Sequence, residues 1–155
     1  MNNSSLTDSS FAAWSLYTGP GNLKPLFPDS NWILGKWGDF EPGEKLTAQS
    51  IKEDIDSRIT IVVKAFTLYC NNSDALHKHF VVPEFFFRCK SGPYPLLEIK
   101  EEDELFGQCT HFPNPDPIDY IKDRLYGELL ETIKSFSSPN TTYTIVCGSI
   151  LTSNI

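Results

Sequence analysis

The run HFVVPEFFF at residues 79–87 decides the fold. It is apolar and partly β-branched, and it is short enough for a strand buried on both faces, as in parallel sheets. Pro83 has no N–H group to donate, so we expect regular pairing to falter there and the chain to leave the sheet close to Glu84. The run YTIVCGSIL at residues 143–151 predicts a second buried strand.

A helix is predicted ahead of each strand, because apolar residues recur every three or four positions from residue 47 to Cys70 and again after Asp116-Pro117. The first apolar face contains Ile51, Ile55, Ile59, Val62, Val63, Phe66 and Cys70, and the second contains Ile118, Ile121, Leu125, Leu129, Ile133 and Phe136. Lys52, Glu53, Asp56, Arg58 and Lys64 are assigned to the other faces of the first helix. The order helix, strand, loop, helix, strand predicts an α/β fold with parallel central strands flanked by helices.

The remaining segments are irregular in pattern. Glycine and proline are too dense in residues 1–46 for a long helix, although short strands near residues 12–17 and 32–34 fit the aromatic-rich sequence. Residues 88–116 are predicted to form a long loop, and loops of this length are usually functional. We therefore divide the chain into an irregular aromatic, Gly- and Pro-rich segment, 1–46, and an α/β part, 47–155.

Composition excludes several classes of protein. The 155 residues contain 13 Lys and Arg against 20 Asp and Glu, a formal charge of -7 that disfavours nucleic acid and anionic membranes as partners. No apolar run approaches the roughly 20 residues of a membrane span, and the start lacks the pattern of a signal peptide, so a cytoplasmic location is the default expectation. Cys70, Cys89, Cys109 and Cys147 form no C-x-x-C pair, which favours reduced thiols, with no metal or cofactor expected.

Glu84 is the candidate catalytic residue. A carboxylate at the end of an apolar run loses hydration and must find a partner or change its pKa, and such a group is a natural general base. We expect it at the carboxyl end of its strand, with restricted solvent access and close to Gly148-Ser149, because open α/β sheets form their sites at this edge. The simpler interpretation is a glutamate that faces water or pairs with Arg88 or Lys90.

The motif order resembles the amino-terminal half of the nitrilase superfamily of carbon-nitrogen hydrolases. In that family a helix leads into a strand ending in Pro-Glu, and a later helix leads into a strand ending in Gly-Ser or Gly-Gly. The matching segments are Val81–Phe87, Gly92-Pro93-Tyr94-Pro95 and Ile145–Ile150, within about residues 50–150. The resemblance implies part of an α-β-β-α sandwich, although the family's first strand, ahead of the helix at Ser50, is not evident.

The resemblance also implies a Glu-Lys-Cys triad in which Glu84 is the general base. The cysteine attacks a nitrile or amide carbon, the lysine stabilises the developing charge, and water releases the acid. Cys89 and Cys147 do not match the nucleophile, nor do Lys90 and Lys100 match the lysine. We therefore expect a truncated or partial carbon-nitrogen hydrolase that is inactive alone and acts on a small amide or nitrile only when a second half completes it; a split-enzyme half and a non-catalytic descendant fit equally.

Other arrangements remain open on the sequence alone. Cys89 could be activated by His77, His79 or His111, and His77-x-His79 could bind a metal with Glu84, but ordinary surface residues are the simpler interpretation. The acidic run from Glu98 to Glu104 is better explained as a solvated loop than as a cation site. The competing function is a non-catalytic α/β binding or interaction module. Because half of a sandwich leaves a sheet face uncovered, we expect a homo-oligomer, a complementary chain or aggregation.

Overall fold

A computed structural model describes residues 8–13, 48–84, 86–88, 93–96, 116–136, 140–150 and 152–154. The elements in chain order are β1 (Ser9–Ala13), α1 (Ala48–Asn71), β2 (His77–Val81), β3 (Tyr94–Leu96), α3 (Pro117–Ser135), β4 (Thr142–Val146) and β5 (Thr152–Asn154). Helices and parallel strands alternate along the chain, so the predicted α/β class is confirmed.

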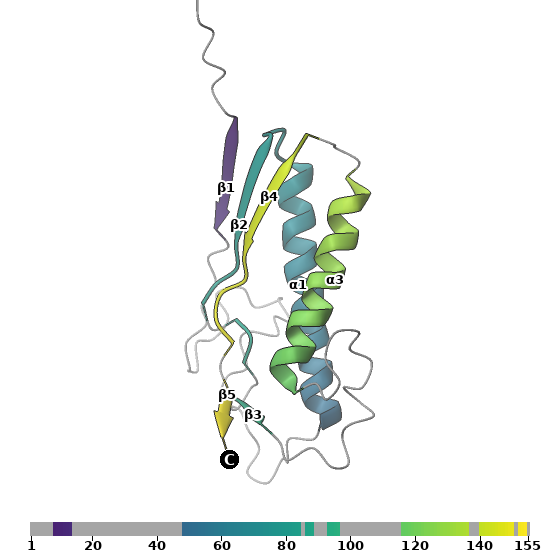
Figure 1. The fold of residues 1–155 in the computed structure, drawn as a ribbon, viewed down its shortest axis with the longest axis vertical. Coiled ribbons are helices and arrows are strands. Elements are labelled where there is room, and N and C mark those ends of the chain that lie inside the picture. Colours follow the sequence, from purple (N-terminus) through teal and green to yellow (C-terminus); the bar gives the residue numbers. More distant parts are fainter. Residues whose placement is uncertain are drawn as a thin grey trace, which may run out of the picture.

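The main sheet is parallel and has three strands in the order β1-β2-β4. Phe80 at its centre lies between Ala12 and Ile145. Figure 1 shows α1 and α3 side by side along one face of this sheet. A second parallel pair, β3 with β5, lies beyond the carboxyl ends of the longer strands.

Helix α1 forms because its apolar residues fall on one stripe. All the predicted core residues of this helix except Val63 are buried: Ile51, Ile55, Ile59, Val62, Phe66 and Cys70. The helix ends at Asn71, where the next amide, Asn72 N–H, donates to the Tyr69 carbonyl at 3.1 Å. The buried Lys78 ammonium on β2 donates to the carbonyls of Cys70 (3.0 Å) and Ser73. This cation satisfies the Cys70 carbonyl, which belongs to the last helical turn, and the Ser73 carbonyl just beyond the helix.

Helix α3 begins at the predicted residues. The Asp116 side chain accepts the Asp119 N–H at 2.9 Å, and Pro117 occupies the first turn, where its missing N–H costs nothing. Ile121, Leu125 and Leu129 are buried as predicted. Ile118, Ile133 and Phe136 are only half-buried. Tyr120 is buried as well, a position that the apolar pattern did not include.

The strands are shorter and less buried than predicted. The pairing of β2 ends at Val81, two residues before Pro83, which confirms that pairing falters there. Burial alternates along β2 and β4, so that Phe80 is 2% exposed whereas Val81 is 38% exposed. The prediction of strands buried on both faces is therefore wrong, because α1 and α3 cover only one face. The uncovered residues, called here the open face, are Ser9, Phe11, Ala13, His77, His79, Val81, Thr142, Thr144 and Val146.

Two further strands differ from the sequence prediction. Of the predicted strand near residues 12–17, Ala12 and Ala13 belong to β1, and residues 14–17 lie outside the described residues. Strand β1 stands ahead of α1, where the family's first strand was not evident. Tyr94–Leu96, inside the expected loop, pairs with Thr152–Asn154. Both strands have partners far away in sequence, which a local pattern does not reveal. The expected strand at 32–34 and most of the loop lie outside the described residues.

Candidate functional site

The carboxyl ends of β2 and β4 meet as the sequence predicted. Val82 N–H donates to the Val146 carbonyl at 2.8 Å, one residue beyond the end of β2. Gly148 follows with φ 63°, and a Cβ atom on it would lie 2.6 Å from the Pro83 carbonyl oxygen. Only glycine permits both this backbone conformation and this close approach. Gly148 therefore fixes the start of the segment that carries Glu84.

Glu84 itself lies on a tight turn after the strand. Phe86 N–H donates to the Pro83 carbonyl at 3.3 Å, which closes the turn around Glu84. Val82, Phe86 and Phe87 are buried, whereas the Glu84 side chain is exposed. The expected restriction of solvent access is wrong, because the turn buries its apolar neighbours and directs the carboxylate outward. No ion pair joins Glu84 to Arg88 in the described part of the chain, and Lys90 lies outside it.

A buried hydroxyl group lies directly after the glycine turn. Ser149 Oγ is inaccessible to solvent and has no hydrogen-bond partner. Leaving a buried polar group unpaired costs about 1–3 kcal/mol, so this hydroxyl can gain free energy by bonding to a ligand or a water molecule. It adds a polar group to the edge where Pro83-Glu84 and Gly148 meet.

Arg58 connects helix α1 to the Glu84 turn, a role that the sequence analysis missed. Its side chain is fully buried, its Nε donates to Asp54 Oδ2 at 2.7 Å, and its Nη1 donates to the Phe86 carbonyl at 2.7 Å. Tyr94 Oη also donates to Asp54 Oδ2, at 2.6 Å. The available signal was the Asp54-x-x-x-Arg58 spacing beside the apolar positions Ile55 and Ile59, which favours an ion pair at the border of the buried stripe.

A second polar cluster joins the two helices. Asp56 on α1 accepts hydrogen bonds from Lys52 Nζ and from Tyr120 Oη on α3, both at 2.7 Å. The hydrogen bond to Asp56 raises the pKa of Lys52, and burial, followed by the Asp56 contact, raises the pKa of Tyr120. Every polar group in this cluster contacts another, so it stabilises helix packing and leaves no group available for chemistry.

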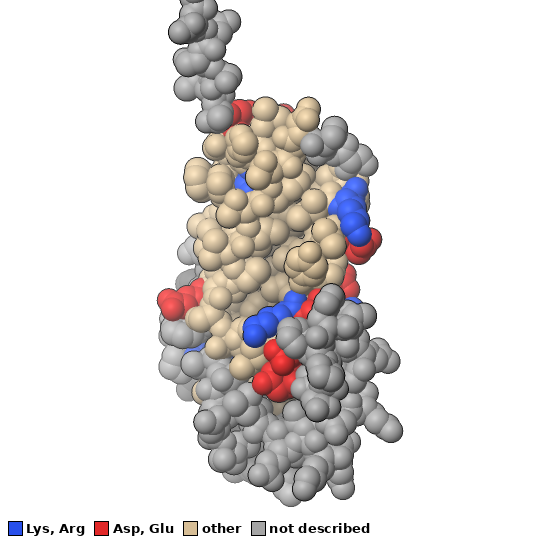
Figure 2. All heavy atoms as spheres, viewed as in Figure 1, with Lys and Arg blue, Asp and Glu red and all other residues tan. Residues whose placement is uncertain are grey.

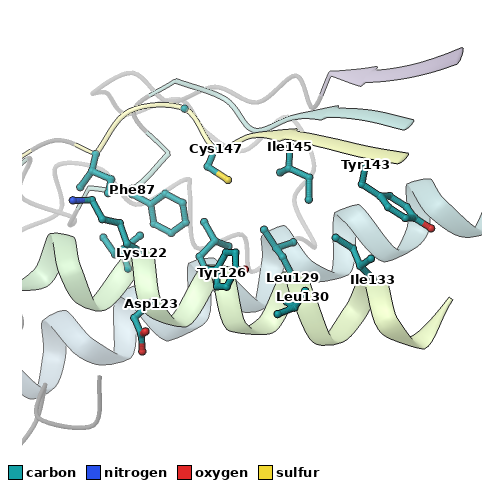
Figure 3. Close-up of a pocket in the computed structure, with 14 residues that line it drawn as sticks. Phe87, Lys122, Asp123, Tyr126, Leu129, Leu130, Ile133, Tyr143, Ile145 and Cys147 are labelled. Atoms are coloured by element: carbon teal, nitrogen blue, oxygen red, sulfur yellow. The ribbon is translucent and has the colours of Figure 1, made fainter. Parts of the chain in front are cut away.

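An apolar groove of about 920 Å³ runs between α3 and β4. Figure 3 shows Leu129 of α3 facing Ile145 and Ile133 facing Tyr143, while Asp123 points away. Lys122 lies near Phe87 at one end of the groove. Among the residues that the structure describes, Figure 2 shows mostly uncharged side chains on this side of the molecule, with charged groups at the borders of that area. Burial raises the pKa of the Cys147 thiol, which disfavours the thiolate needed of a nucleophile.

The other candidate residues that the structure describes do not assemble into a site. Strand β2 places His77 and His79 on the open face, where the His79 ring stacks on Phe11 with a centroid distance of 4.3 Å. Among the described residues, no group of three or more His, Cys, Asp and Glu is arranged to bind a metal ion. Cys89, Lys100, Cys109, His111 and the acidic run from Glu98 to Glu104 lie outside the described residues. No helix in the described part of the chain is long and apolar enough to cross a bilayer.

Comparison with protein-family models, curated proteins and solved structures finds no match to this chain. The nitrilase resemblance therefore remains a prediction that depends on the motifs and on the geometry around Glu84.

Proposed function

We propose that this chain supplies the general-base part of a carbon-nitrogen hydrolase of the amidase or nitrilase type, with Glu84 as the base. The observation that carries the proposal is the meeting of the Glu84 turn with Gly148 at the shared carboxyl edge of two parallel strands. This edge is where α/β sheets bind their ligands. The proposal includes the finer fold assignment, in which the open face of the sheet is the inner face of an α-β-β-α sandwich.

The chemistry needs two groups besides the carboxylate. In the proposed reaction the base accepts a thiol proton, the thiolate sulfur bonds to the amide or nitrile carbon, and a lysine stabilises the charge that develops on the substrate. An amide then loses its amine, a nitrile takes up water and loses ammonia, and a further water molecule cleaves the thioester to release the acid. Glu84 is exposed here, whereas electrostatic catalysis is strongest where water is excluded. A second chain or segment that brings the lysine and the cysteine would also cover the carboxylate.

The first test measures the chain by itself. Release of ammonia from a set of small amides and nitriles should not exceed the buffer background, because base, lysine and thiol act as one unit. Intact-mass analysis after incubation should detect no acyl adduct. Turnover that disappears in Cys89→Ser and survives in Cys147→Ser would contradict this expectation and identify Cys89 as the nucleophile.

The second test supplies the missing groups in trans. The chain is mixed with the carboxyl-terminal half of a carbon-nitrogen hydrolase that carries the strand-borne lysine and the cysteine. Hydrolysis should appear with the mixture and should be lost in Glu84→Gln. The matched control is Glu128→Gln on the outer surface of α3, which should retain it. Hydrolysis that is indifferent to Glu84→Gln would refute the proposed role.

The second candidate function is a non-catalytic α/β module that associates with another copy of itself through the open face. The observation that favours it is the exposure of apolar side chains there: Phe11 is 76% exposed and Val146 is 51% exposed. Sedimentation of the purified chain tests for association. A monomer that unfolds cooperatively and stays soluble at high concentration would contradict this candidate and indicate a complete small domain.

A further inference from the structure

Arg58 is a fully buried cation on helix α1, and its contacts divide between two parts of the molecule. On the helix itself it forms a two-point contact with Asp54, through Nε at 2.7 Å and Nη2 at 3.2 Å. Away from the helix it donates Nη1 to the Phe86 carbonyl at 2.7 Å. Burying a charge is costly unless specific hydrogen bonds compensate, so these contacts define where the guanidinium group can lie.

The surroundings of Arg58 keep it in this orientation. Tyr94 Oη donates to the same Asp54 oxygen that receives Arg58 Nε, which gives the carboxylate a second hydrogen-bond donor. The Phe86 ring lies with its centroid 5.6 Å from the guanidinium carbon, close enough for a cation–π contact. A guanidinium group can donate along several fixed directions at once, which a lysine ammonium on a flexible stem cannot reproduce.

The Glu84 turn is therefore held at both of its ends. At one end the Pro83 carbonyl packs against the backbone of Gly148, and at the other end the Phe86 carbonyl accepts the hydrogen bond from Arg58. Glu84 lies between these two carbonyls. We propose that Arg58, oriented by Asp54 and Tyr94, is the positioning residue of the Glu84 turn: it sets where the carboxylate stands without contacting a substrate. Its importance for catalysis rests on the proposed function, whereas the fixing of the turn does not.

The test compares substitutions of two basic residues at different places on α1. Arg58→Lys keeps the positive charge and loses the forked donor set. The control, Lys52→Met, removes the ion-pair partner of Asp56, which contacts α3 and not the turn. Amide hydrogen exchange at Phe86 is measured relative to Val62 within α1, and the backbone amide chemical shift of Glu84 is followed by NMR.

In Arg58→Lys, exchange at Phe86 should accelerate about tenfold to a hundredfold relative to Val62, the range expected for losing a hydrogen bond from a charged donor. The backbone amide chemical shift of Glu84 should change together with it, because the turn moves. Lys52→Met should change neither quantity. Unchanged exchange at Phe86 together with an unchanged Glu84 amide shift in folded Arg58→Lys would overturn the proposal.

Chemical rescue separates positioning from general stability. Arg58→Ala with added millimolar guanidinium should regain slow exchange at Phe86, whereas methylammonium at the same concentration should not restore it. If Arg58→Ala does not fold, Tyr94→Phe takes its place: it removes one hydroxyl from Asp54 and should produce a smaller acceleration at the same amide. Equal recovery with both cations, or no acceleration in Tyr94→Phe, would contradict the proposal.

The hydrogen-exchange test at Phe86 does not depend on enzymatic activity. Faster exchange at Phe86 supports the positioning role even if the reconstituted hydrolase proves indifferent to Glu84→Gln, a result that would refute only the proposed function. Conversely, if Glu84→Gln abolishes hydrolysis while Arg58→Lys leaves the exchange at Phe86 and the Glu84 amide shift unchanged, the positioning role alone fails.

Discussion

The two faces of the parallel sheet belong to the same three strands but have opposite surroundings. On the face covered by α1 and α3, Phe80 is 2% exposed and contacts the rings of Phe66 and Tyr69. On the open face, its neighbour Val81 is 38% exposed. Phe80 and Val81 are both apolar, so residue type alone does not account for the difference between them; the placement of the helices does.

The sequence therefore encodes one layer of helices and a sheet with apolar residues on both sides. An isolated α/β layer normally exposes polar residues on its solvent side. The open face is mixed: Ser9, His77, His79, Thr142 and Thr144 are polar, but Phe11, Val81 and Val146 are large apolar residues exposed to solvent. The partner expected from the sequence would cover these three apolar side chains, and that partner stays a prediction.

The largest expected effect comes from testing the covered face directly. Phe80→Ala should lower the free energy of unfolding by about 3–5 kcal/mol, because truncating a fully buried aromatic leaves a cavity. Its matched control is Val81→Ala on the open face of the same strand, which should cost much less. Urea denaturation followed by circular dichroism gives both values. Equal losses from the two substitutions would contradict the assignment of a covered and an open face.

The next effect concerns the turn where β2 and β4 end together. Gly148→Ala should destabilise the fold by about 1–3 kcal/mol, since alanine at a positive φ is strained and its Cβ would meet the Pro83 carbonyl. Gly127→Ala on α3 is the control: nothing lies within 4 Å of the added Cβ, and it should stabilise by about 0.4–1 kcal/mol. In thermal unfolding, the melting temperature of Gly148→Ala should fall and that of Gly127→Ala should rise. A shift of both melting temperatures in the same direction would contradict this expectation.

The stability of the fold should depend on pH in the alkaline range, because the Cys70 thiol is buried on the covered side of the sheet. Burial raises the pKa of Cys70 from 9.0 to about 11, although the nearby Lys78 opposes the shift. The unfolded chain loses this proton at lower pH than the folded chain does, so the stabilising contribution is complete below pH 9 and declines as pH rises towards 11. In Cys70→Ala this part of the decline should disappear, as measured by urea midpoints across that range. Parallel curves for the two proteins would contradict the raised pKa.

The smallest effect on stability is expected on the open face. Val146→Lys should change the free energy of unfolding by less than about 0.5 kcal/mol, since the side chain is half exposed and away from the helices. Self-association, measured by sedimentation, should nevertheless weaken, because a charge would enter the apolar surface. Ser9→Lys, at the polar margin of the same face, is the control. Association that persists unchanged in Val146→Lys would place the interface elsewhere.

Much of the helical part of the fold was predictable from the sequence. The stripe from Ile51 to Cys70 and the Asp116-Pro117 start locate both helices closely, because these signals are local. The edge at which both strands leave the sheet was also predictable, since Pro83 and Gly148 act on the backbone directly, although each strand ends earlier than its apolar run. The open face could not be predicted: Val81 and Val146 are apolar, so the runs that contain them look continuous and conceal the alternation of the strands.

The candidate site, like the fold, was predictable only in part. The meeting of Pro83-Glu84 with Gly148 follows from the order of the motifs, but the exposure of Glu84 depends on how the turn is directed. Arg58 was assigned to a polar face because it is charged, and its burial depends on two contacts, Asp54 and the Phe86 carbonyl, of which only the first is local in sequence. Long-range hydrogen bonds of this kind leave no periodic pattern.

Strand β1 has a kinetic and thermodynamic consequence for the whole sheet. Its pairing brings Ser9 beside His77, with residues 14–47 between β1 and α1. Joining segments so distant along the chain costs roughly 3–4 kcal/mol in closure entropy. Three contacts of Ser10 oppose that cost on the covered face. Its carbonyl accepts the Tyr69 hydroxyl at 2.8 Å, and its own hydroxyl lies 2.6 Å from Tyr69 Oη and 2.7 Å from Ser73 Oγ. Strand β1 should therefore join the sheet last during folding and detach first in local unfolding, which exposes the edge of β2 before α1 or α3 separates.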